Sequence, residues 1–598
     1  MVLMLFSICL ITILFLLFLL VLSTVITTTF IQDTQQQYRL SLYYQYAMAL
    51  SEDKNINDDD DTLKTFKKEF CGLGGQQPHS NEYITEYILP QSCEMPLGIA
   101  VDNDANKVWY VSTKKGVLGS YDIKRAKFDE EHQIPEWKSR ENPRGFSQVW
   151  DIKIDRKEGD IWFTDQIQNI IWRYIKSSNV FEKYNIPGKS NYFGTIYPMS
   201  IEFDPHDDNI MYFVGTFLPS LWIADITKLK NSTSRGISEI PIPTDGFKGI
   251  HQVYVVTGLI AFDDKRDAIW ISMLAYGKKG QIFRYDLDSK SFDIFDLPKE
   301  LNSPWGLTVD NDGNLWVTNV GTSLFYKLNP DKDNNIITKF VTSKTSPRIF
   351  GDTKTINKYK EIYKNSYTIP SMIKKSNDGD DIWFNQQYGN KIAKFNPSDR
   401  KLIEYWIPTQ NRLWGVCSND SNSNTNGIRI SDTSSYNSNR CGIANVLQFS
   451  VGHTNDNNKQ QQQIWFTEWS ENKIGKVDID KKLPFSVSVF KSDKELTMHR
   501  GQNEKIKIRI KAGESPSYPI YDIRMVAAGT FTSTGDLGDS KGHFNKQSIS
   551  LDREGEEKLV SFVFRPSGDL KPGDYTLMIG AENDSISYLR AIKITISS

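Results

Sequence analysis

The sequence lacks an excess of either charge, since its 598 residues include 71 basic and 73 acidic side chains. Binding to nucleic acid requires a basic surface that neutralises phosphates, so this balance argues against a nucleic-acid partner. Long helical periodicity is also missing after residue 80, which argues against a helical domain there. Aromatic residues make up 12% of the chain and include 14 Trp, a richness typical of packed β-sheets.

The first 30 residues lack any charged side chain and consist mainly of Leu, Ile, Phe and Val. A run of this length can span a bilayer. It outlasts the apolar core of a typical signal peptide, and no small-x-small cleavage site follows it. We therefore predict a transmembrane helix over residues 1–30, with a cleaved signal peptide as the alternative. No Lys or Arg precedes the run, so the positive-inside rule does not orient it.

Cysteine is scarce, and one of the five, Cys9, lies in the predicted span. An even number of remaining cysteines in an exported chain is typical of disulfides. Pairing of Cys71 with Cys93 would fix the segment before the repeats, and pairing of Cys417 with Cys441 would close a polar insertion. Other pairings and free buried thiols are the alternatives.

Residues 31–80 are polar and contain an acidic run at 58–61, a composition typical of a solvated stalk. Glycosylation sequons begin at Asn231, Asn419 and Asn583, which is compatible with an exported surface. Together with the apolar N-terminus, these features predict a single-pass membrane protein with most of the chain outside the cytoplasm.

A short sequence motif, here called the repeated word, recurs along the chain. Its clearest copy is Ile-Trp-Phe-Thr-Glu at 464–468, followed by Asn-Lys-Ile-Gly-Lys-Val at 472–477. A β-rich run, a polar loop and a second alternating run are typical of a hairpin. Copies of the first run occur seven times, at residues 108–111, 161–164, 210–213, 269–272, 315–318, 382–385 and 464–467.

Each copy lies in a larger unit of four predicted strands. An apolar strand precedes most copies, as at 96–102, across a turn rich in Asp, Asn and Gly. After several hairpins comes a strand that ends in proline, as at 404–408, which suits an outer edge strand. Seven such units predict an all-β, seven-bladed β-propeller over residues 81–483. We expect residues 83–90 to pair with the seventh blade and close the ring.

A different pattern begins after residue 483. Alternating strands at 485–490, 505–510, 558–564 and 591–596 predict an immunoglobulin-like β-sandwich over residues 484–598. The last strands, from 575 onward, are expected to form its edge.

The words Trp-Phe-Thr-Glu at 465–468, Asn-Lys-Ile-Gly at 472–475 and Glu-Tyr-x-Ile-Pro at 404–408 together resemble the streptogramin B lyase family. The resemblance spans roughly residues 81–480 and implies a seven-bladed propeller. It also implies an enzyme that opens a cyclic depsipeptide by elimination at an ester bond, aided by magnesium. The family's general base is a His in a Glu-Pro-His-Gly-Ile word on the innermost strand of the last blade, with a Glu in the following strand.

This sequence departs from that pattern at the base. We read the innermost strand of blade seven at 413–417, which places Trp414 where the His is expected; an alternative register through 440–445 also lacks a His. Glu468 stands near the family's Glu, but one carboxylate without its base is not a catalytic set. His251, just before the innermost strand of blade four, is the other catalytic candidate; the alternative is a hydrogen-bonded surface residue.

Two functions therefore remain open. One is a divalent-metal-dependent C–O lyase or lactonase-like enzyme, and the other is a non-catalytic surface propeller that binds a small molecule, a glycan or a protein at its funnel. Oxygen-bearing residues that follow the second-strand words are expected to face the central channel, where they suit Mg²⁺ or Ca²⁺. The alternative is that they only satisfy loop amides. These residues are Ser112, Asp165, Asn319, Gln386 and Glu468.

Three tryptophans are predicted on innermost strands, namely Trp150, Trp305 and Trp414. They suit a stacking surface for a sugar or aryl ligand, and the alternative is that they plug the channel.

Overall fold

The computed structural model describes residues 78–137, 148–188, 194–331, 336–344, 367–377, 379–411, 442–456, 459–490, 495–515, 518–529 and 540–597. Within these ranges the only helices are short 3-10 turns: η1 Ile226–Lys228, η2 Asp245–Phe247, η3 Gln252–Tyr254 and η4 Lys299–Leu301. None of the helices in the described ranges is long and apolar enough to cross a membrane. The predicted membrane span and stalk lie outside these ranges, so both stay predictions.

Seven four-stranded antiparallel units, here called blades one to seven, make up the described chain as far as residue 477. Their strands, from the innermost to the outermost, are β2 Pro96–Asp102, β3 Lys107–Ser112, β4 Val117–Asp122 and β5 Lys127–Gln133; β6 Ile152–Ile154, β7 Ile161–Asp165, β8 Ile170–Ile175 and β9 Val180–Asn185; β10 Pro198–Phe203, β11 Ile210–Gly215, β12 Leu218–Asp225 and β13 Ile237–Pro241; β14 Val255–Asp263, β15 Ala268–Ala275, β16 Lys279–Asp286 and β17 Ser291–Asp296; β18 Pro304–Val309, β19 Leu315–Asn319, β20 Leu324–Asn329 and β21 Ile336–Val341; β22 Pro370–Lys375, β23 Ile382–Gln386, β24 Lys391–Asn396 and β25 Lys401–Trp406; and β26 Val446–Asp456, β27 Lys459–Glu468, β28 Lys473–Val477 and β1 Ile84–Ile88.

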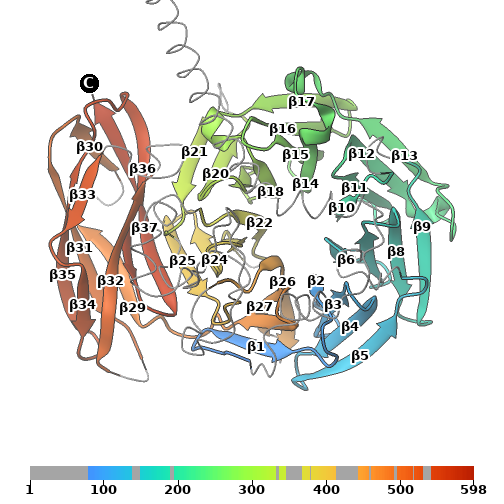
Figure 1. Cartoon of the computed structure of the whole chain (residues 1–598), viewed down its shortest axis with the longest axis horizontal. Coiled ribbons are helices and arrows are strands. Elements are labelled where there is room, and N and C mark those ends of the chain that lie inside the picture. Colours follow the sequence, from blue (N-terminus) through green and yellow to red (C-terminus); the bar gives the residue numbers. More distant parts are fainter. Residues whose placement is uncertain are drawn as a thin grey trace, which may run out of the picture. The chain divides into compact units, whose positions relative to one another are not determined.

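The blades surround a central axis (Figure 1). Each innermost strand contacts that of the next blade, and β26 contacts β2, so the ring is closed. All seven repeated words lie in second strands, as predicted. The predicted closing strand is also present, because β1 pairs antiparallel with β28 and supplies the outermost strand of blade seven. Chain segments from the two ends of the propeller therefore share one sheet.

The innermost strand of blade seven is not where the sequence reading placed it. It is β26, which begins at Val446, whereas the expected strand was 413–417 or, in the alternative register, 440–445. Trp414 lies outside the described residues and not on this strand. The prediction failed because β26 begins Val-Leu-Gln and lacks the Pro-x-Gly start of other innermost strands, such as Pro96 to Gly98 of β2.

A buried carboxylate explains why Trp recurs in the second strands. In the first five blades, an Asp at the end of the innermost strand or just after it accepts a hydrogen bond from the aromatic side chain of the second strand. The bond satisfies the polar group of a ring that is otherwise sealed in the core. The pairs are Asp102 with Trp109, Asp155 with Trp162, Asp204 with Tyr212, Asp263 with Trp270 and Asp310 with Trp316, at 3.3, 2.9, 3.1, 2.8 and 2.8 Å.

Blade six breaks this rule and gives a testable consequence. Ser376 stands where the first five blades have Asp, and the buried Trp383 Nε1 has no hydrogen-bond partner among the described residues. We expect Ser376→Asp to raise the free energy of unfolding by about 1 kcal/mol, because it supplies the missing acceptor. Urea denaturation measures the change. Ser376→Ala is the control, and a Ser376→Asp variant no more stable than this control would contradict the proposed rule.

A second repeated side chain joins neighbouring blades. In four blades, the last residue of the repeated word on the second strand donates a hydrogen bond to a backbone carbonyl on the innermost strand of the following blade. This explains the Thr, Ser or Asn in the repeated word, which a purely apolar strand would not need. The donors and acceptors are Ser272 with Trp305 at 2.7 Å, Thr318 with Ser371, Asn385 with Val446 at 2.7 Å, and Thr467 with Leu97 at 2.9 Å.

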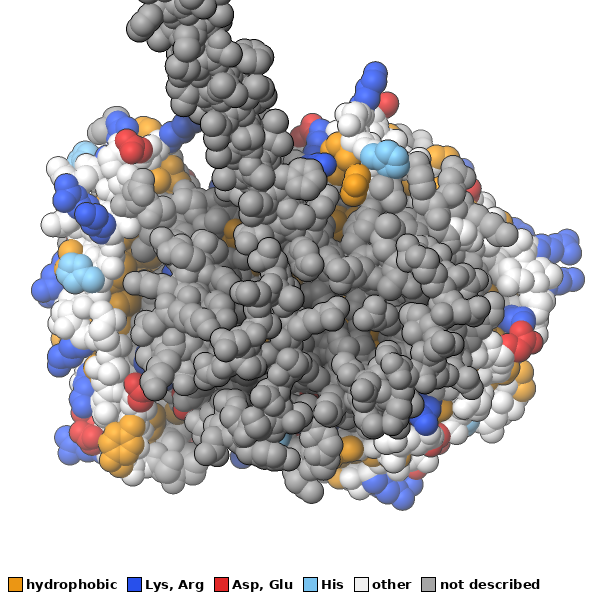
Figure 2. Space-filling view, in the orientation of Figure 1, with side chains coloured by type: hydrophobic (Ala, Val, Ile, Leu, Met, Phe, Trp, Pro, Cys, Tyr) orange, Lys and Arg blue, Asp and Glu red, His pale blue; other side chains and the backbone are white. Residues whose placement is uncertain are grey.

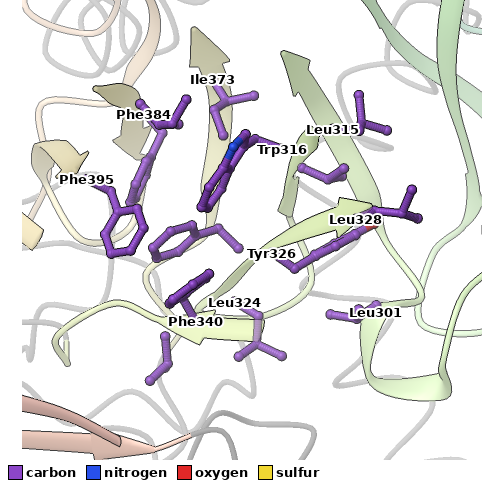
Figure 3. Packing of buried hydrophobic residues seen from close by; sticks show 14 of the residues in the cluster. Leu301, Leu315, Trp316, Leu324, Tyr326, Leu328, Phe340, Ile373, Phe384 and Phe395 are labelled. Atoms are coloured by element: carbon purple, nitrogen blue, oxygen red, sulfur yellow. The ribbon is translucent and has the colours of Figure 1, made fainter. Parts of the chain in front are cut away.

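Aromatic side chains fill the space between blades, as Figure 3 shows for blades five and six. Trp316 and Phe395 have ring centroids 5.5 Å apart, and Phe340 lies 4.7 Å from Phe395. These rings are buried. Their apolar burial is the main stabilising term between the two blades.

The remaining strands form two further sheets after residue 484. One has the order β29 Phe485–Phe490, β31 Glu504–Ala512, β35 Glu557–Arg565 and β33 Lys541–Phe544. The other contains β37 Ile586–Ser597, β36 Gly573–Glu582, β32 Ile520–Gly529 and β34 Ser548–Leu551, with β30 Glu495–His499 parallel to β37. Buried residues alternate along these strands, as expected of sheets with one core face. The immunoglobulin-like topology stays a prediction.

Two expectations about sheet edges were wrong. Strand β25 was read as an outer edge strand and β36–β37 as the edge of the sandwich, yet β25 pairs antiparallel with β37. The sheet of blade six therefore continues into the C-terminal sheet. Five of the six residues of β25 are buried, in contrast to the largely exposed outer strands β5 and β13.

Basic and acidic side chains both occur around the described rim of the face shown in Figure 2, in keeping with the near-zero net charge.

Cys93 is disulfide-bonded. Its partner is not among the described residues, so the pairing with Cys71 stays a prediction.

Candidate functional site

The oxygen-bearing residues at the second-strand ends are engaged inside their own blades. Asp165 accepts hydrogen bonds from the backbone and side chain of Gln168 at 3.0 and 2.8 Å. Asn319 accepts from the backbone of Ser303 at 2.9 Å. Both side chains are fully buried. For these two residues, the hydrogen bonds agree with the alternative reading, in which they satisfy loop amides.

Gln386 belongs to a buried ionic cluster in blade six. Its amide donates to Glu404 at 2.8 Å, and Glu404 also accepts from Lys391 at 3.1 Å. The side chains of Lys391 and Glu404 are both fully buried. The Lys391 ammonium lies 4.2 Å from the centroid of the Trp406 ring, a cation–π contact that offsets part of its lost hydration.

Glu468 occupies the equivalent place in blade seven. It lies opposite Lys473 in the β27–β28 register, and Lys473 forms an ion pair with Glu86 at 3.0 Å. Glu86 also accepts from the backbone and hydroxyl of Thr409 at 3.1 and 2.6 Å. The side chains of Glu86 and Lys473 are fully buried. This cluster ties the closing strand β1 to the seventh blade.

Burial favours the neutral form of the Glu468 carboxyl. Burial, followed by the charge of Glu86, raises its pKa well above the ordinary value of 4.5, and Lys473 only partly opposes this shift. Its two oxygens have no hydrogen-bond partner among the described residues. In an unfolded chain the same group ionises near its ordinary pKa. Folding therefore becomes less favourable as pH rises above that value, up to the raised pKa of the folded state.

We expect Glu468→Gln to flatten this pH dependence. The free energy of unfolding of the wild type should fall as pH rises above the ordinary pKa of 4.5, and the variant should lose less over the same range. Urea titrations at several pH values measure the slopes. Part of the slope should persist, because burial also raises the pKa of Glu94 to about 7. Equal slopes in the two proteins would contradict the prediction; exposed Glu82 supplies the control, Glu82→Gln.

The other predicted residues are dispersed. His251 is exposed in the loop before β14 of blade four, with its ring edge-on to Tyr254, whereas Glu468 ends β27 of blade seven. Trp150 and Trp305 are almost completely buried, at 5% and 2% exposure. Among the described residues, no group of three or more His, Cys, Asp or Glu side chains is placed to hold a metal ion. The catalytic, stacking and metal-binding roles stay predictions.

A ring of residues that the sequence reading missed surrounds the axis. Each lies on an innermost strand, directly opposite the aromatic residue of the second strand. We call this set the axis ring. Its members, in blade order, are Ala100, Lys153, Glu202, Ala261, Thr308, Lys374 and Ser450.

The charged members of the axis ring meet across the propeller. Lys153 of blade two forms an ion pair with Glu202 of blade three at 2.6 Å. Burial, followed by the charge of Lys153, lowers the pKa of Lys374 in blade six. Blades two and six are not neighbours, so this charge effect acts across the axis. Lys153 and Glu202 keep 23% and 29% of their side-chain surface exposed, so solvent reaches this region.

Asp151 and Gln448 lie beside the axis ring. Asp151 accepts hydrogen bonds from the backbone amides of Ile152 and Ile201, at 3.1 and 2.9 Å. The side-chain amide of Gln448, on blade seven, donates to the carbonyl of Trp150 next to blade two. A signal for the ring was present in the sequence, because Lys153 interrupts an otherwise apolar Ile-x-Ile strand. The sequence could not show which of the charged side chains lie close together.

Comparison with known proteins supports the repeat reading. A model of the NHL repeat matches residues 301–324, in blade five. No curated protein matches the chain. The virginiamycin B lyase structure from Staphylococcus aureus is 18% identical with a TM-score of 0.45, covering 66% of this chain and 99% of that one. A catalytically inactive variant of that enzyme with quinupristin is 18% identical with a TM-score of 0.43, at 66% and 99% coverage.

The propeller resembles those of the streptogramin B lyases. Another similar structure is the extracellular domain of a one-component system from B. thetaiotaomicron, 14% identical with a TM-score of 0.37, covering 84% of this chain and 57% of that one. These likenesses concern the fold.

The structure also revises the place of the expected general base. Strand β26 begins at Val446. Its second residue, Leu447, therefore occupies the position where the His is expected. The same position holds Leu97 in blade one and Trp305 in blade five. Leu447 is 5% exposed and cannot take a proton, so the departure from the family pattern holds in the corrected register.

Proposed function

We propose that this protein is a non-catalytic, ligand-binding β-propeller anchored at the outer surface of a membrane. The observation that carries the proposal is the axis ring, where charged side chains with exposed surface converge from blades two, three and six. Charged groups that converge on the axis of a propeller are suited to orienting a small ligand.

The burial of Glu468 and the residue at the family's His position support binding over catalysis. Glu468 is buried beside Glu86 and Lys473, where it contributes to the closure of blade seven. Glu468 has no exposed surface, so its carboxyl is not placed to reach a substrate in the channel. Leu447 supplies no proton acceptor at the position of the family's His.

The test combines a ligand panel with an activity assay on the full-length chain. We expect at least one small polar ligand to raise the melting temperature, and we expect no ring opening of a cyclic depsipeptide of the streptogramin B type. Mass spectrometry detects that reaction as formation of the linear product. Turnover that requires Mg²⁺ or Ca²⁺ and disappears in Glu468→Gln would overturn the binding proposal and favour the lyase.

A further inference from the structure

The axis ring leaves one cation without a partner. Among the described residues, Lys153 is held by Glu202, whereas Lys374 forms no hydrogen bond or ion pair. Its neighbour Lys375 points toward blade five, where its ammonium donates to Asn311 at 2.8 Å and its backbone amide donates to Thr308 at 3.2 Å. Strand alternation thus turns Lys374 to the opposite face, toward blade seven and the axis.

Lys374 is half-buried in a ring of mostly small side chains. Four of the seven axis-ring residues are small, namely Ala100, Ala261, Thr308 and Ser450. The other three members, Lys153, Glu202 and Lys374, have long charged side chains. An ammonium group that has lost part of its hydration without gaining a partner is a costly arrangement in a structural core. A functional role accounts for it.

The charges around Lys374 favour an anion. The ring itself carries two lysines and one glutamate, and the carboxylate of Asp151 beside it already accepts two backbone amides. Burial and Lys153 both disfavour the charged form of Lys374, so its pKa is lowered although Asp151 and Glu202 oppose the shift. An anion placed between the two ammonium groups would remove the repulsion and supply the missing acceptor.

We propose that the axis of the propeller carries a binding site for a small carboxylate or phosphate anion, with Lys374 as its free anchor and Lys153 as its second cation. The proposal rests on the ligand-binding function and adds the chemical class of the ligand. Both anion types accept hydrogen bonds from ammonium groups, and Lys binds them as a point charge.

The test is isothermal titration calorimetry of the full-length chain with inorganic phosphate and, separately, with succinate. We expect the wild type to bind at least one of them, more weakly as the salt concentration rises. Lys374→Gln should weaken binding at least tenfold, and the matched control Lys375→Gln should change it less than twofold. Glu202→Gln should strengthen binding several-fold, because it releases Lys153 from its ion pair.

Two outcomes would overturn the anion site: no binding of either probe by the wild type, or equal affinities in wild type and Lys374→Gln. A higher affinity for phosphate or for succinate shows whether the site prefers a phosphate or a carboxylate. The broader function is judged separately with a panel of uncharged ligands. An uncharged ligand that stabilises the wild type and Lys374→Gln equally would keep the binding function and remove the anion site.

Discussion

Replacing Glu86 with Ala is expected to lower the free energy of unfolding by about 3–5 kcal/mol, the range found when one partner of a buried ion pair is removed. Glu86 accepts from Lys473 at 3.0 Å and from Thr409 at 2.6 Å, and its loss leaves a fully buried ammonium without its carboxylate. Because Glu86 lies on β1, the closing strand should also detach. Urea denaturation and hydrogen exchange of residues 84–88 measure the two effects.

Glu468 provides the control for this prediction. In Glu86→Gln the neutral carboxyl of Glu468 can lose its proton and take over as partner of Lys473, so we expect a smaller loss. The double variant Glu86→Gln, Glu468→Gln has no such replacement, and its loss should exceed the sum of the single losses. Additive losses would show that Glu468 and Glu86 do not share Lys473. A fully stable Glu86→Ala would show that the cluster does not close the ring.

Replacing Leu589 with Asp is expected to cost at least about 3 kcal/mol, because it removes a buried side chain and leaves a charge without a partner. Leu589 is 0% exposed and lies opposite Leu402 in the β25–β37 register. It packs in one cluster with Phe340 and Phe395 of the propeller. The substitution should expose β25 as an apolar edge strand, which promotes association between chains. Thermal unfolding and size-exclusion chromatography measure both results.

Lys593→Ala is the matched control, since Lys593 lies on the same strand β37 but only makes solvent-exposed ion pairs with Glu495 and Asp574. Surface pairs of this kind contribute about 0–1 kcal/mol. If Leu589→Asp were as stable and as monomeric as Lys593→Ala, the junction between blade six and the C-terminal sheet would not contribute to stability.

The places where sequence reasoning succeeded share a local cause. The alternating pattern of the word at 464–468 predicts a β-strand wherever it occurs. Its Trp recurs because the indole N–H donates a hydrogen bond to a buried carboxylate, as Trp162 does to Asp155. Asp155 and Trp162 are seven residues apart, so one hairpin contains the whole interaction. Interactions between residues this close in sequence can be predicted without knowledge of the fold.

The misplaced strand of blade seven had the opposite cause. Val446, Leu447 and Gln448 carry none of the turn or glycine signals of the other innermost strands, and a long polar insertion separates them from blade six. Strand β25 was misread for a related reason. Its proline-ended word matches an edge strand, while its burial comes from β37, which lies almost two hundred residues further along the chain. Its apolar residues Leu402 and Ile403 were the available signal.

The sequence by itself determined the all-β class, the seven-fold repeat, the closing strand and the absence of a His in the family's word. These follow from periods and words within single hairpins. Only the tertiary structure decided what the polar residues do. Closing the ring places Glu468 inside blade seven beside Glu86 and Lys473, and puts the innermost strands that carry Lys374 and Lys153 across the axis from each other. Their meeting depends on non-local packing, because desolvation and charge act through space, not along the chain.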